Sequence, residues 1–180
     1  MRSRQLIAEL RASPFKQFVY MFVATVVIQT LHMVEHVAQV FQKFVLDYSY
    51  AHGLVGSFDL EQVHFTFNLL YLGALIYVTL GWLSFGRRVC RHEKMLGAML
   101  IATVAVQGYH MVEHSARLIQ FLNTGLQGTP GLLGANFDGV VFHAVMNTAV
   151  YLPAVVVFVC SGMHRQIFKR DYTVYYKGAS

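Results

Sequence analysis

The sequence predicts an all-α integral membrane protein, a four-transmembrane-helix bundle formed by tandem duplication of a two-helix unit. Composition is the first reason: 56% of the 180 residues are hydrophobic, 13% are charged and the mean hydropathy is +0.47. Soluble domains carry about 25% charged residues. The second reason is a set of four long apolar segments, and the third is a motif that occurs twice.

Each of the four apolar segments is long enough to cross a bilayer, because a hydrocarbon core of about 30 Å requires about 20 helical residues. The segments cover residues 15–46, 62–85, 95–122 and 139–163. The first follows a basic, amphipathic lead at residues 1–14 and has no small-residue cleavage site. We therefore expect a retained anchor and not a signal peptide.

The lysines and arginines are distributed unevenly along the chain. Twelve of the fourteen precede the first span, separate the second from the third, or follow the fourth, and only Lys43 and Arg117 lie at the other ends. This positive-inside pattern predicts cytoplasmic termini, with the bacterial inner membrane as the expected location. The net charge of +5 thus reports topology, and no nucleic-acid partner is expected. The lipid bilayer is the expected partner, while membrane-complex subunits and homo-oligomers are left open.

The chain aligns with itself after a shift of 78–79 residues. Residues 29–36, Gln-Thr-Leu-His-Met-Val-Glu-His, match residues 107–114, Gln-Gly-Tyr-His-Met-Val-Glu-His. The element Gly-Leu-x-Gly begins at Gly53 and again at Gly131, and beyond each copy a histidine is followed by an asparagine four residues later. Two aligned blocks of this kind predict an internal repeat.

The repeat divides the chain into residues 1–90 and residues 91–180, the second with a basic C-terminal tail. Because each unit holds two spans, the units share one orientation and should be related by an axis along the membrane normal. The loops that join the paired helices are predicted to be small, ordered caps with glycines in tight turns. Asp59 and Asp138 precede the second helix of each unit. Two roles are considered for these aspartates: each could be the N-cap of the helix that follows, or it could support the histidines through a hydrogen bond.

Histidines and glutamates of the two units are predicted to converge. Helix positions i, i+3 and i+4 share a face, which places both histidines and the glutamate of each His-Met-Val-Glu-His segment together. At 1.5 Å per residue, all the histidines of the repeat fall in the outer third of the bilayer. The set consists of His32, Glu35, His36 and His64 in the first unit and of His110, Glu113, His114 and His143 in the second.

This pattern favours a metal site, because ionisable groups within spans are costly and mark functional positions. Two imidazoles one turn apart can bind one ion, and a partner-helix histidine makes a third ligand and leaves an open position. The sequence predicts two transition-metal ions, and iron, copper and zinc all accept imidazole. Cys90 and Cys160 lie near the cytoplasmic ends, so no thiolate is expected at the cluster. Glu35 and Glu113 are candidate ligands and catalytic residues: they could bridge the ions, act as bases, or orient histidines.

The string His-x-x-Glu-His resembles the inverted zinc-protease motif, in which two histidines bind zinc and the glutamate is the general base. The match spans five residues within a predicted transmembrane helix, and family membership is not inferred from it. Three histidines per metal on a four-helix frame is also similar to coupled dinuclear copper proteins and to histidine-rich membrane di-iron oxygenases. These are similarities of ligand arrangement, which do not establish function.

The predicted function is that of a membrane metalloprotein with a dinuclear site near the extracytoplasmic side. Redox or oxygen chemistry and metal-assisted hydrolysis are both open, so an oxidoreductase or a hydrolase is a hypothesis. One alternative is a haem-binding or accessory subunit of a membrane electron-transfer complex, although a histidine pair on one helix is surplus to a bis-histidine haem. A metal carrier or sensor without catalysis is another.

Further residues near the cluster qualify this prediction. Arg117 occupies the position aligned with Gln39 and so breaks the symmetry of the repeat beside the histidines. Asn68 and Asn147 lie one turn deeper than the partner-helix histidines. They suit either hydrogen bonds to metal ligands or interhelical packing.

Overall fold

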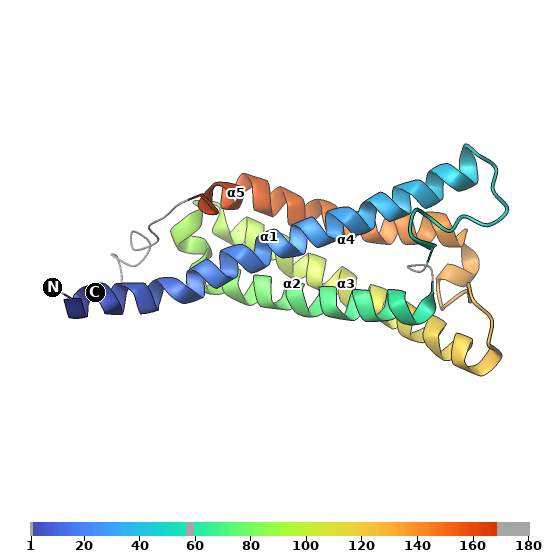
Figure 1. Cartoon of the computed structure of the whole chain (residues 1–180), viewed down its shortest axis with the longest axis horizontal. Coiled ribbons are helices and arrows are strands. Elements are labelled where there is room, and N and C mark those ends of the chain that lie inside the picture. The colour runs from blue at the N-terminus through green and yellow to red at the C-terminus, as the bar shows by residue number, and fades with distance from the viewer. Residues whose placement is uncertain (1, 57–59, 169–180) are drawn as a thin grey trace.

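The computed structural model describes residues 2–56 and 60–168, with side chains from residue 14 onward. In this part of the chain all regular structure is helical, and four long helices lie side by side (Figure 1). These helices are α1 (Arg2–Phe44), α2 (Glu61–Val89), α3 (Glu93–Thr124) and α4 (Gly139–Cys160). A 3-10 helix, η2 (Gly134–Asn136), lies in the second loop, and the short helix α5 (Met163–Gln166) follows α4.

The prediction of four helices of spanning length is confirmed, since all four are long and apolar enough to cross a membrane. Only 33–39% of the residues in their most apolar stretches are buried, and large side chains such as Leu31, Leu70 and Leu80 are exposed on the outside. An apolar exterior of this extent is typical of a surface that contacts lipid. The predicted basic lead is continuous with the first span, because α1 begins at Arg2. α4 ends before its predicted limit, because Gly162 adopts a left-handed φ of 70°.

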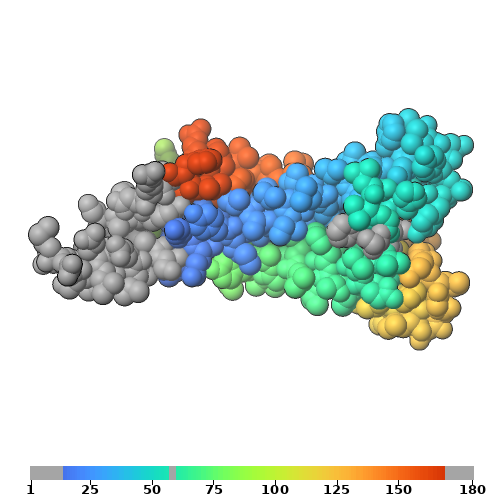
Figure 2. All heavy atoms as spheres, in the orientation of Figure 1, coloured from blue at the N-terminus to red at the C-terminus, as the bar shows by residue number. Residues whose placement is uncertain are grey.

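The helices form a ring in which α1 and α3 each pack mainly against α2 and α4. The loops between α1 and α2 and between α3 and α4 lie at one end, which we call the loop end (Figure 1). The connection from α2 to α3 and helix α5 lie at the other end, which we call the α5 end (Figure 1). Figure 2 shows the two loops as separate lobes. The basic tail beyond residue 168 lies outside the described residues.

Aromatic and aliphatic side chains fill the α5 end. Phe18 and Phe22 on α1 are buried against Trp82 on α2 and Leu100 on α3. The indole Nε1 of Trp82 donates to the backbone oxygen of Glu93 at 2.9 Å. This cluster holds the helices together at the α5 end through side-chain packing.

Toward the loop end the buried residues become polar. Gln29, Asn68, Gln107 and Asn147, one from each helix, are fully buried. Buried amides are stable only when they are hydrogen-bonded, so their partners indicate what this part of the bundle is built to hold. Those partners include the histidines.

Candidate metal centre

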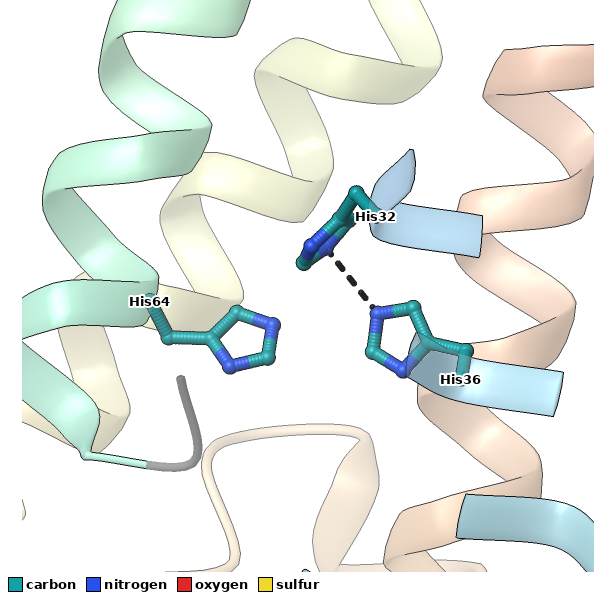
Figure 3. Close-up of side chains that lie close together, drawn as sticks. All are labelled: His32, His36 and His64. Carbon is teal, nitrogen blue, oxygen red and sulfur yellow. Dashed lines mark hydrogen bonds between the residues drawn. The ribbon is translucent and has the colours of Figure 1, made fainter. Parts of the chain in front are cut away.

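The first unit brings three imidazoles together (Figure 3). His32 and His36 lie one turn apart on α1, and their Nε2 atoms are 3.0 Å apart. His64 reaches them from α2, with its ring centroid 5.2 Å from that of His32 and 5.5 Å from that of His36. One nitrogen from each ring lies within 4.8 Å of the other two. We call this group the first triad.

The second unit repeats the arrangement. His110 and His114 on α3 have Nε2 atoms 3.0 Å apart, and the ring of His143 on α4 lies 5.9 Å and 5.2 Å from theirs. Their nitrogens also fall within 4.8 Å of one another. We call this group the second triad.

The two triads are adjacent. His64 of the first triad stacks on His114 of the second at 4.9 Å between ring centroids, and His36 lies 6.3 Å from His143. All six histidines are buried. The predicted convergence on one cluster is therefore found, with room for two neighbouring ions. That these histidines are metal ligands stays a prediction.

Glutamine side chains determine the tautomer of two of the rings, that is, which nitrogen carries the hydrogen. Nδ1 of His36 lies 2.9 Å from Oε1 of Gln39, and Nδ1 of His110 lies 3.3 Å from Oε1 of Gln107. An amide oxygen can only accept, so Nδ1 carries the hydrogen and the lone pair of each neutral ring resides on Nε2. Nε2 is the nitrogen that faces the other histidine of the pair, which is the orientation that a shared ion requires.

Asparagine side chains connect the two units. The side-chain nitrogen of Asn147 lies 3.0 Å from Nε2 of His36, and the side-chain oxygen of Asn147 accepts from Gln29 at 3.0 Å. Both bonds run from α4 to α1. The aligned contacts join α2 to α3. The side-chain nitrogen of Asn68 lies 3.3 Å from Nε2 of His114, and the side-chain oxygen of Asn68 accepts from Gln107 at 3.0 Å. Of the two roles left open for the asparagines, hydrogen bonds to the histidines are thus found.

The carboxylate of Glu35 is used by the first loop. It accepts from the backbone N–H groups of Leu54 and Val55, each at 3.0 Å. Gly53 has a φ of 75°, and a Cβ there would lie 2.1 Å from the Glu35 carboxylate. Gln42 bonds both the N–H and the C=O of Gly53, at 2.8 and 2.7 Å. The glutamate thus fixes the loop to the helix that carries the histidine pair.

Glu113 does the same in the second unit. It accepts from the backbone N–H groups of Leu132, Leu133 and Gly134 at 2.8, 3.1 and 2.8 Å. Neither glutamate belongs to the histidine triads. Their predicted roles as ligands and catalytic residues remain predictions. Both carboxylates accept from loop amides, and that of Glu113 also accepts from the hydroxyl of Tyr109 at 3.5 Å. The sequence signal for this pairing is the spacing between His-Met-Val-Glu-His and Gly-Leu-x-Gly, which is the same in both units.

An ion pair that was not predicted from the sequence lies beside the second triad. Nε of Arg117 donates to both carboxylate oxygens of Glu61 at 3.1 Å, and Glu61 is 2% exposed. Nη1 of Arg117 lies 3.2 Å from Nδ1 and 3.0 Å from Nε2 of His143. Glu61 aligns with Val140, just as Arg117 aligns with Gln39. The sequence signal for this ion pair was that Glu61 and Arg117 carry opposite charges and that each aligns with an uncharged residue in the other unit.

A cavity of about 370 Å³ lies between the histidines and the loops, and His36, His64, Arg117 and His143 line it. At its rim Lys43 pairs with Asp138. Asp138 caps α4 by accepting from the N–H groups of Val140 and Val141 at 3.1 and 3.2 Å, which confirms one of its two predicted roles. The hydrogen bond from Lys43, together with those amides, holds the pKa of Asp138 below its usual value. Asp59 lies outside the described residues.

Two groups of three buried imidazoles can hold two ions, each with a coordination position left for another molecule. The cavity would give such a molecule a path from the loop end. No family model, curated protein or solved structure matches this chain, so a functional assignment depends on this geometry.

Proposed function

We propose that this chain is a membrane metalloprotein that binds two transition-metal ions, one at each histidine triad. The convergence of six buried imidazoles carries the proposal. Polar groups in a low-dielectric bundle are costly unless they are paired or bound to cations. Bound ions would turn this cost into stabilisation, because metal binding to a folded site adds to the folding free energy.

The donor set favours copper. Imidazole nitrogens accept copper, zinc, iron or nickel, and carboxylate donors shift the preference toward iron and zinc. Glu35 and Glu113 bond the loop amides, so within the described residues each triad offers nitrogen donors alone. Two three-histidine groups side by side are also similar to the ligand arrangement of coupled dinuclear copper proteins.

The same contacts favour redox or oxygen chemistry over hydrolysis. In metal-assisted hydrolysis a general base near the bound water speeds proton removal, and the two glutamates expected to supply it are held by loop amides. Redox chemistry requires only the ions and an open coordination position. Copper would supply one-electron steps, while the chain orients the imidazoles and encloses the site. A haem fits less well, because the stacked rings of His64 and His114 leave no slot for a macrocycle between them.

The test is the metal content of full-length protein purified in detergent, measured together with its visible spectrum. We expect about two ions per chain, no Soret band, and a loss of about one ion in each of the variants His36→Ala and His114→Ala. His92→Ala is the matched control, because His92 is exposed and lies at the α5 end. Full metal content in both variants, or a Soret band in the wild type, would contradict the proposal.

Activity separates a redox enzyme from a metal carrier. Oxygen uptake with ascorbate as electron donor should be catalysed by metal-loaded wild type and should drop to background in His36→Ala. If metal-loaded wild type gives no uptake above that of the free metal, the redox role fails while metal binding stands.

A further inference from the structure

We infer that the two triads are not equivalent: the first triad is the tighter metal site, and Arg117 obstructs the second by occupying a ligand nitrogen of His143. The inference rests on the proposed function, because it concerns how the same histidines share their ions. Under this inference, Arg117 and Glu61 determine the order in which the two triads bind metal ions.

The hydrogen bonds of His143 show which of its ring nitrogens has the lone pair that a metal ion would need. Nδ1 lies 2.8 Å from the backbone oxygen of Gly139, and a carbonyl can only accept, so Nδ1 carries the hydrogen. The lone pair of the neutral ring is then on Nε2. Nη1 of Arg117 lies over both ring nitrogens, 3.2 Å from Nδ1 and 3.0 Å from Nε2, and only Nε2 can accept its hydrogen bond. A single lone pair cannot accept a hydrogen bond from the guanidinium and coordinate a metal ion at the same time. Binding at the second triad therefore requires Arg117 to leave His143.

His64 occupies the aligned position in the first triad, and its environment is the opposite. Its Nε2 is buried and has no hydrogen-bond partner among residues 14–56 and 60–168. The side chain at the position aligned with Arg117 is the neutral Gln39, whose Oε1 accepts from Nδ1 of His36. A ligand atom in the first triad is thus free where its counterpart is occupied.

The other donors near the triads do not produce this difference. Asn147 contacts His36 at 3.0 Å and Asn68 contacts His114 at 3.3 Å, so each triad has one neutral amide against one histidine. The second triad adds a charged donor, the guanidinium of Arg117. The asymmetry comes from Arg117.

Charge reinforces the obstruction. A guanidinium stays protonated in proteins and repels a divalent ion at short range in a low-dielectric bundle. Glu61 holds Arg117 in place through a bidentate contact, in which Nε donates to Oε2 and Nη2 donates to Oε1, and this contact resists displacement of the guanidinium. Removing one partner of a buried pair is costly, whereas replacing both by neutral residues is often tolerated.

The experiment is a titration of metal-stripped, full-length protein with Co²⁺ alone, followed by its visible absorption. We expect two binding steps whose affinities differ by about 10- to 100-fold, the range seen when groups behind metal ligands are changed. His64→Ala should remove the tighter step, and His143→Ala should remove the weaker one.

The double variant Glu61→Val/Arg117→Gln copies the aligned residues Val140 and Gln39 and so avoids an unpaired buried charge. It should bring the weaker step to within about threefold of the tighter one, which reverses most of the 10- to 100-fold effect. Lys43→Gln removes the other cation of the loop end, whose partner is Asp138, and should change neither step.

Equal affinities in the wild type, loss of the tighter step in His143→Ala, or an unchanged second step in the double variant would overturn the inference while two-ion binding stands. Absence of any Co²⁺ binding at the histidines would overturn the proposed function and the inference with it.

Discussion

The two ends of the bundle differ in the polarity of their buried side chains. At the α5 end, Phe18, Phe22 and Leu100 are buried in an apolar cluster. Toward the loop end, the same helices bury six histidines and a set of amides and carboxylates. The first end can hold the helices together by close packing, which is the main force between helices in lipid. The second buries polar groups, some of them without a hydrogen-bond partner among the described residues, and this composition fits the proposed metal site.

This contrast implies that stability and function are separated along the bundle axis. A substitution at one end should therefore leave the properties of the other end unchanged. Sites far apart and without shared partners usually give additive free energies, so the comparison fails if the two ends prove strongly coupled.

The largest effect is expected from Phe22→Ala, which empties a fully buried site. We expect a loss of about 3 kcal/mol in the free energy of unfolding, at the lower end of the range for large-to-small core changes, because lipid reduces the transfer contribution. Unfolding in mixed detergent micelles measures the loss. Metal content of the folded fraction should stay at the wild-type value, and Leu80→Ala on the exposed face should do little. Loss of metal in Phe22→Ala would show that the ends are coupled.

Removal of a single metal ion should have the next largest effect. An ion present at 100 times its dissociation constant contributes about 2.7 kcal/mol, so chelation should lower the free energy of unfolding by about this amount per site. Hydrogen exchange should increase at the loop end and stay constant around Phe22 and Trp82. The loss should be of equal size in the Phe22→Ala background, and a clearly smaller loss there would count against separate ends.

Within the loop end, Gly53→Ala tests the contact between loop and helix. The substitution forces a side chain into a positive φ and against the Glu35 carboxylate, and we expect a loss of about 2 kcal/mol. Gly73→Ala is the control, since a Cβ there meets nothing within 4 Å and the helix interior should gain about 0.5–1 kcal/mol. Equal behaviour of the two variants in the detergent unfolding assay would contradict the anchoring role of Glu35.

The smallest effect belongs to the exposed rim. Asp138→Asn keeps the α4 cap but loses the ion pair with Lys43, so it should cost less than about 1 kcal/mol after solvent screening. Because the pKa of Asp138 is lowered in the folded state, its contribution is present above the ordinary aspartate pKa and is lost as the pH falls through the lower folded value. Unfolding curves of wild type and Asp138→Asn should therefore differ at neutral pH and converge in acid. A difference that persists in acid would exclude this pair as its cause.

The sequence predicted the helices and the histidine cluster well for one reason. Helical periodicity states which residues share a face, and four apolar segments leave one shared interior for the polar faces, so the convergence of His32, His64, His110 and His143 followed. The partners of Glu35 could not be assigned in this way. A residue at i+3 shares the histidine face but can turn toward a loop, and the loop backbone that receives it has no side-chain signature. Tandem duplication and membrane insertion remain predictions.

The crossing hydrogen bonds of Asn68 and Asn147 have a consequence for how such a chain could arise. Each asparagine donates to a histidine of the opposite unit, so a unit alone lacks the donor for its own histidine pair. Two identical copies of residues 1–90 would complete each other, since Asn68 of one copy would face His36 of the other as Asn147 does in this chain. An ancestral gene encoding a single hairpin could thus have made a working homodimer. If the predicted duplication is correct, fusion of two such genes would have allowed each copy to acquire a charge that the other lacks, Glu61 in the first unit and Arg117 in the second.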